Sequence, residues 1–203
     1  IGIALFPTHG TDYETLRRHA DLAMYRAKTA TKGSVAFFTR DLGRQASERL
    51  TFEQRLRAAV AAAEFCCALQ KKIDMRSGEV VGFEALARWG RGPRHVGAPN
   101  DFLPLASELG LLDDITMHVV DDLIGHLPAL DVVFGTAVRY SLNVSAEQTA
   151  NVGFMLKLAR RLAAHDGRRF VLELTEETLA ATGPLETHVL PMLRAAGIGL
   201  SID

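Results

Sequence analysis

The chain has 203 residues, of which 48% are hydrophobic and 23% are charged, and its formal net charge is −1. These values are ordinary for a globular protein, and the near-zero charge argues against a nucleic acid polymer or an anionic membrane surface as the partner. No apolar run approaches the roughly 20 residues that cross a bilayer, so no membrane contact is expected from this segment.

The first 38 residues are predicted to form a strand, a turn, a helix and a second strand. Gly2–Phe6 and Val35–Phe38 are short and apolar, and Gly10 lies in the turn that follows the first of them. Apolar residues between Leu16 and Ala27 recur at helical spacing. Because about 40 residues bury little core, this piece is expected to belong to a domain that begins upstream.

A connecting helix is predicted over residues 39–63, because apolar residues follow one face of this segment and Glu and Arg follow the other. The join lies near Leu42–Arg44. The expected parts are residues 1–40, a linker helix at 41–63 and a second domain at 64–203.

From residue 64 onward, strands alternate with helices. The predicted strands are Phe65–Met75, Val80–Trp89, Val138–Val144, Phe170–Leu174 and Ile198–Ile202. The predicted helices are Asp101–Leu109, Asp113–Leu127, Phe154–Ala164 and Pro184–Ala196. Ser77 and Gly78 are hairpin residues, so the first two strands are expected to be antiparallel. The alternation that follows predicts an α/β fold with a parallel sheet.

The two cysteines, Cys66 and Cys67, are adjacent in the first of these strands. Consecutive strand residues point to opposite faces, so a disulfide between them would be strained. The chain contains no other cysteine, which favours a reducing, cytoplasmic setting and leaves open a membrane anchor elsewhere in the parent protein.

Four side chains with oxygen atoms lie at or near the ends of the predicted strands: Glu84, Asn143, Glu173 and Asp203. The last three are separated by 30 residues each, about one strand-helix unit. In a parallel barrel the carboxyl ends of the strands meet at one rim, so these residues would converge there. Oxygen ligands suit Mg²⁺ or Mn²⁺, which would polarise a phosphate and activate water. Spacing alone leaves open that they are unrelated polar residues at strand ends.

Local sequence around these residues resembles a known family. Phe83–Trp89 reads FEALARW and resembles the Glu-Ala-Leu signature of EAL phosphodiesterases. Further segments resemble the family in the same order along the chain: Gln70–Asp74, Gly78–Gly82, Pro99–Ala106, Glu108–Leu112, Leu142–Ser145, Leu172–Glu176 and Ser201–Asp203. Together these motifs cover about residues 64–203.

The resemblance implies a partial (β/α)8 TIM-like barrel with an antiparallel first strand, and hydrolysis of cyclic di-GMP to linear pGpG with Mg²⁺ or Mn²⁺. It implies that Arg88 binds a substrate phosphate, Gln70 lines the nucleotide pocket and Glu176 supports the site. It further implies that the domain forms a homodimer. The metal ligands that it implies are Glu84, Asn143, Glu173 and Asp203. The three acids among them, Glu84, Glu173 and Asp203, are the implied catalytic residues.

The front segment resembles the C-terminal end of GGDEF diguanylate cyclase domains, through Ile1–Ala4, Phe6–Pro7 and the stretch from Ala20 to Lys28. Lys28 and Lys32 fall where that family contacts nucleotide phosphates. The Gly-Gly-Asp-Glu-Phe hairpin is not in this chain, so these lysines are not expected to support turnover of GTP. The cyclase-then-EAL order matches a common tandem arrangement.

Three functions stay open for the parent protein: a phosphodiesterase, a degenerate EAL domain that binds cyclic di-GMP without cleaving it, and a bifunctional protein dominated by the cyclase. The family usually has Tyr-Gln-Pro where this chain has Leu69-Gln70-Lys71, which favours the second. The intact Glu84, Asn143, Glu173 and Arg88 favour the first. A full barrel takes about 250 residues, so the segment from 64 to 203 is not expected to be active alone.

Overall fold

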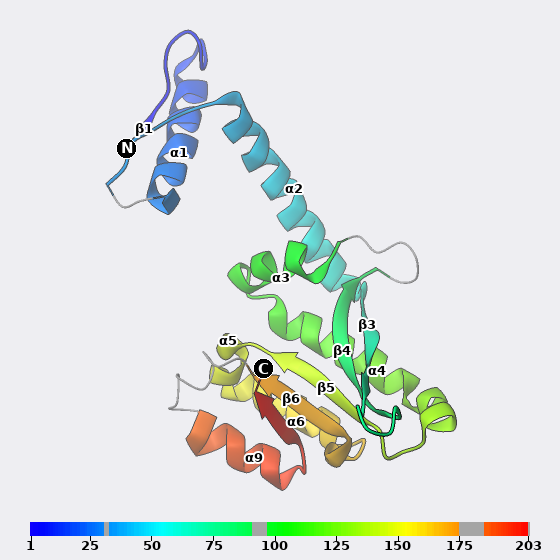
Figure 1. Ribbon diagram of the computed structural model, residues 1–203. Coiled ribbons are helices and arrows are strands. Elements are labelled where there is room, and N and C mark those ends of the chain that lie inside the picture. The colour runs from blue at the N-terminus through cyan, green and yellow to red at the C-terminus, as the bar shows by residue number, and fades with distance from the viewer. Residues whose placement is uncertain (31–32, 91–96, 175–184, 203) are drawn as a thin grey trace. The chain divides into compact units, whose positions relative to one another are not determined.

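The computed structural model describes residues 1–30, 33–90, 97–174 and 185–202. It divides into two compact units, residues 1–56 and 57–203, which are described separately (Figure 1). Among the described residues, no helix is both long and apolar enough to span a membrane. The predicted linker helix forms as α2 (Arg40–Ala61), and the three-part division of the chain stays a prediction.

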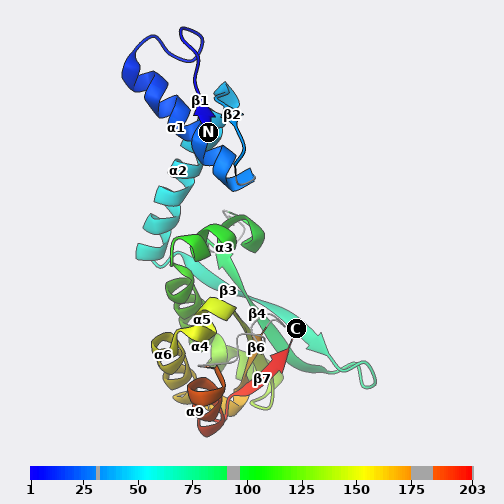
Figure 2. The same cartoon turned by 90° about the vertical axis from the view of Figure 1, so that its left-hand side faces the viewer.

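In the first unit, two short parallel strands are joined by one helix. β1 (Gly2–Ile3) pairs with β2 (Ala36–Phe37), and α1 (Tyr13–Ala30) lies between them in the chain. The view in Figure 2 shows both strands beside α1. Gly2 allows this close approach, because a Cβ there would clash with the helix backbone at Ala20 and Met24.

The second unit is built on a five-stranded sheet whose strands lie in chain order. β3 pairs antiparallel with β4, and every later pair is parallel. The strands are β3 (Phe65–Ile73), β4 (Val80–Trp89), β5 (Arg139–Val144), β6 (Phe170–Leu174) and β7 (Gly199–Ile202). Each lies within two residues of its predicted bounds, and the mixed α/β arrangement fits a TIM-like fold.

The helices of this unit follow the predicted order with three differences. The helices are α3 (Pro99–Glu108), α4 (Leu112–Phe134), α5 (Ala146–Ala150), α6 (Val152–Ala163) and α9 (Leu190–Ala195), with a 3-10 turn at Gly167–Arg169. α4 continues through Pro128 beyond its predicted end, α5 was not predicted, and a π-helical turn at Leu185–Val189 replaces the start of the last predicted helix. The first predicted residue of that helix, Pro184, lies outside the described residues.

The core lies between the helices and one face of the sheet (Figure 1). Alternate strand residues point to this face and are buried, among them Phe83, Tyr140, Leu142 and Leu172. The residues between them in sequence point to the other face of the sheet, and Glu84, Asn143 and Glu173 are among these residues. This alternation separates an apolar face, which stabilises the unit, from a polar face, which is free to carry chemistry.

Candidate active site

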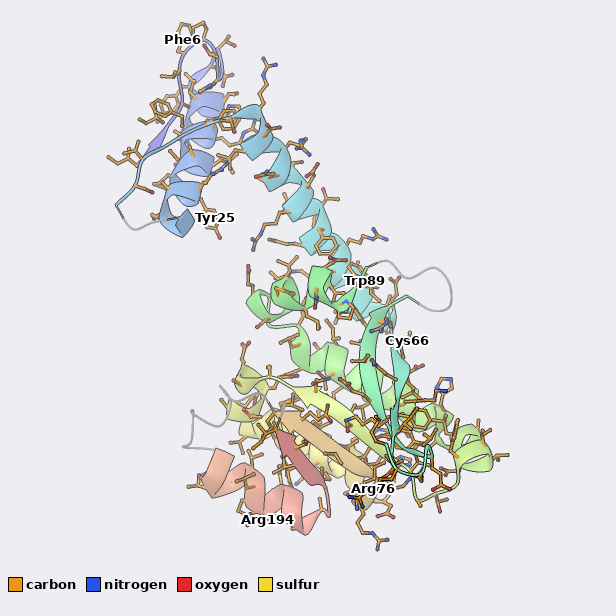
Figure 3. All side chains as sticks on the ribbon, in the orientation of Figure 1. Phe6, Tyr25, Cys66, Arg76, Trp89 and Arg194 are labelled. Carbon is orange, nitrogen blue, oxygen red and sulfur yellow. The ribbon has the colours of Figure 1, made fainter. Side chains whose placement is uncertain are left out.

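The predicted site residues that the structure describes lie on the polar face of the β3–β7 sheet. The strand register sets Gln70 opposite Glu84 and Asn143 beside Glu173. The hairpin strands β3 and β4, together with β5 and β6 from later in the chain, therefore contribute to one surface. Figure 3 orients this face: Cys66 and Trp89 mark the end of the β3–β4 pair toward which β4 runs, and Arg76 marks the hairpin at the other end.

Glu84 and Asn143 are in direct contact. The Asn143 amide Nδ2 donates a hydrogen bond to Glu84 Oε1 at 2.7 Å. With its nitrogen turned to Glu84, the amide of Asn143 has its carbonyl oxygen to offer to a cation. Two of the four residues that the resemblance assigns to metal binding are thus in contact, although their role as ligands stays a prediction.

Glu173 is paired with a lysine that the sequence analysis did not select. The Glu173 side chain is buried, with 8% of the residue exposed. Lys72 Nζ donates a short hydrogen bond to Glu173 Oε1 and another to Ser141 Oγ at 2.8 Å. The signal was present in the sequence: Lys72 is two residues from Gln70 and Ser141 is two from Asn143, so strand alternation places them on the same face.

Arg88 lies four residues after Glu84 on the same face of β4, nearer the carboxyl end of the strand. Its Nη1 donates to the carbonyl of Ala87 at 2.8 Å, and its side chain is partly buried. Gln70 is exposed. The planar guanidinium of Arg88 is suited to bind a phosphate at this end of the sheet. The exposed side-chain amide of Gln70 is accessible to a ligand.

Asp203 and Glu176 lie outside the described residues, as does Lys32 of the front segment. In the described part of the chain, no group of three or more His, Cys, Asp or Glu side chains is placed to hold a metal. Glu84, Glu173 and the amide oxygen of Asn143 supply donors of the type that Mg²⁺ and Mn²⁺ prefer. The donor chemistry fits a hard cation, and the Lys72 contact on Glu173 opposes one.

Cys67 takes no part in this chemistry. It points to the helix side of β3, into a cavity of about 440 Å³ that is lined mainly by apolar side chains of β3 and α4. Burial, reinforced by the nearby Asp122 carboxylate, raises the pKa of the Cys67 thiol to about 12. The thiol therefore stays protonated at neutral pH, which lowers its reactivity as a nucleophile.

Comparison with known proteins places this site in a family. A family model described as EAL domain matches residues 53–203. The chain is 32% identical over 206 residues to the bifunctional diguanylate cyclase/cyclic di-GMP phosphodiesterase MucR of Pseudomonas aeruginosa, covering all of this chain and 30% of MucR. It is 32% identical over 205 residues to the cyclic di-GMP phosphodiesterase PdeR of Escherichia coli K12, covering all of this chain and 31% of PdeR.

A solved structure agrees with these matches. The PaMucR phosphodiesterase in complex with c-di-GMP has a TM-score of 0.65 and 29% identity over 74% of this chain and 62% of that one. The chain spans less than a third of the length of either curated relative. The family match includes every strand of the sheet that carries the candidate site. The chain therefore belongs to the EAL domain family.

Proposed function

We propose that the protein containing this chain is a cyclic di-GMP phosphodiesterase that hydrolyses its substrate to linear pGpG with Mg²⁺ or Mn²⁺. The observation that carries the proposal is the convergence of Glu84, Asn143 and Glu173 on one polar face. The names of MucR and PdeR, which match over the whole chain, support the substrate class.

Each residue has a proposed task. Arg88 binds a substrate phosphate through its guanidinium fork, and Gln70 contacts the nucleotide. Glu176 supports the site from the segment after β6. A metal ion held there would supply Lewis-acid chemistry, which polarises a phosphate and activates water. The residues that would hold the metal are Glu84, Asn143, Glu173 and Asp203.

We further propose that residues 1–40 are the C-terminal end of a GGDEF domain. The parallel β1–β2 pair with α1 between its strands supports an α/β domain edge, and MucR is named as a diguanylate cyclase as well. Lys28 would face nucleotide phosphates only in the complete domain. A cytoplasmic location, supported by the reduced cysteines, and a homodimer, supported by the family resemblance, stay predictions.

The phosphodiesterase proposal is tested in the full-length protein with Glu84→Gln, which keeps the size of the side chain and removes its charge. Linear product is measured by chromatography with Mg²⁺ present. We expect turnover to fall by at least about 100-fold, because a lost metal ligand removes the electrostatic stabilisation of the reacting phosphate.

Glu79→Gln is the matched control, since Glu79 is exposed in the hairpin before β4. Turnover in this variant is expected to equal that of the parent protein. If the Glu84 variant retains full activity while folded, Glu84 has no part in the reaction and the assignment fails.

A second function is favoured by the Lys72–Glu173 contact. A lysine bound to a carboxylate that the metal needs would suit a domain that binds cyclic di-GMP without cleaving it. Saturable ligand binding with no linear product at any metal concentration would select this receptor function.

A further inference from the structure

The buried carboxylate of Glu173 has a cationic partner supplied by the chain itself. The side chain of Glu173 is 10% exposed, and that of Lys72 is 38% exposed. A buried carboxylate is costly unless a positive group compensates it. Lys72 supplies that compensation from β3, which is separated from β6 by the two strands β4 and β5.

Lys72 reaches Glu173 across two intervening strands. Lys72 is opposite Gly82 in the β3–β4 register, and its ammonium reaches across β4 to Ser141 on β5 and Glu173 on β6. A Cβ at Gly82 would lie 2.8 Å from the carbonyl oxygen of Arg139. Glycine at this position therefore permits the close pairing of β4 with β5.

A divalent cation bound to Glu173 would lie next to the ammonium of Lys72, which contacts Oε1 of the same carboxylate. Two positive groups in contact with one carboxylate repel each other strongly where solvent is partly excluded. Lys72 is the group that can leave, because it is the more exposed partner and its stem is flexible. The metal and the lysine are thus alternative partners of Glu173.

We propose that Lys72 is a displaceable counter-ion of the metal site, which stabilises Glu173 without metal and lowers the affinity of the site for a divalent cation. The proposal rests on the proposed function in one respect, that Glu173 is a metal ligand. If the proposal holds, Lys72 lowers the affinity of the site for the metal although Lys72 is not itself a metal ligand.

The test is Mn²⁺ affinity, measured by the loss of the free-ion electron paramagnetic resonance signal in the full-length protein. Lys72→Met, which removes the charge and keeps a linear side chain, is expected to bind Mn²⁺ tighter by about fivefold or more. Lys72→Arg keeps the charge and is expected to stay within about twofold of the parent protein. Lys71→Met is the matched control, because Lys71 is exposed and points to the other face.

Thermal unfolding gives a second readout that a purely structural lysine would not produce. With chelator present, Lys72→Met is expected to melt below the parent protein, because Glu173 loses its partner. With saturating Mn²⁺, the melting temperature of the variant should rise more than that of the parent, since the tighter ligand stabilises the fold more. If Lys72 had only a packing role, Lys72→Met would lower the melting temperature by the same amount with chelator and with Mn²⁺.

Equal or weaker Mn²⁺ affinity in Lys72→Met overturns the proposal, and so does the absence of Mn²⁺ binding in both proteins. This failure is distinguishable from failure of the proposed function. Metal-dependent product formation with unchanged affinity in the variant would reject the role of Lys72 and keep the phosphodiesterase. Tighter Mn²⁺ binding in the variant without product formation would keep the role of Lys72 and reject the phosphodiesterase.

Discussion

Glu84 and Asn143 are 59 positions apart in sequence, yet one hydrogen bond joins them. Motif resemblance predicted both residues, but neither composition nor spacing could predict the bond, because it depends on the register of β4 against β5. Lys72 was missed for a related reason. The family motif marks Gln70 as the functional residue of β3. That the Lys72 side chain reaches across β4 depends on the sheet and cannot be predicted from local sequence.

Cys67 carries a prediction of its own. Because its thiol pKa is about 12, its reactive thiolate at pH 8 is about 1,000-fold rarer than for a cysteine at the ordinary value of 9.0. In a Cys66→Ala variant, iodoacetamide should therefore label Cys67 slowly in the folded protein. Mass spectrometry across pH 7 to 9 measures the rate, and the urea-unfolded chain is the control.

The raised pKa of Cys67 also determines how the free energy of unfolding changes with pH. As pH rises, the unfolded chain releases the Cys67 proton first, near pH 9, while the folded chain holds it until about pH 12. This residue's contribution to stability is thus lost progressively above pH 9. Rapid labelling of the folded protein at pH 8 would contradict the buried environment described for Cys67.

The elements around the site are set by local signals of unequal strength. The alternation of strands with helices predicted every strand of the sheet to within two residues. α5 was too short, at five residues, to show helical periodicity, but Ser145 and Gln148 cap it reciprocally. α4 passes Pro128 because the apolar face beyond it still packs on the core through Leu130, which offsets the hydrogen bond that proline cannot make.

Asn151 connects α5 to α6, and α5 follows the strand that bears Asn143. Its Oδ1 accepts a hydrogen bond from the Phe154 backbone amide at 3.1 Å, and its Nδ2 donates to Asp113 Oδ2 at 3.0 Å. Asn151→Ala is expected to lower the free energy of unfolding by about 1 kcal/mol, as loss of a helix cap does. Urea denaturation measures the change.

Asn151→Ser is the control for this cap, because a serine hydroxyl can still accept from the helix amide. It should recover most of the lost stability. If both variants are as stable as the parent protein, the cap contributes nothing and α6 is held by its packing alone.

For the whole molecule, resemblance and geometry contributed different parts. Strand-helix alternation predicted an α/β unit with a parallel sheet, but it could not identify the family, since polar residues at strand ends are common in such folds. Ordered motifs identified the EAL domain. The sheet register then brought Glu84, Asn143 and Glu173 to one face, and Asp203 and Glu176, outside the described residues, stay predictions.

We propose that in the complete protein this polar face carries out metal-dependent hydrolysis of cyclic di-GMP. The most direct measurement is turnover by the full-length protein, after removal of bound metal with chelator and again after addition of Mg²⁺ or Mn²⁺. We predict linear pGpG only in the presence of the metal. Product formed at the same rate in chelator, or no product from a folded protein with either metal, would contradict the account.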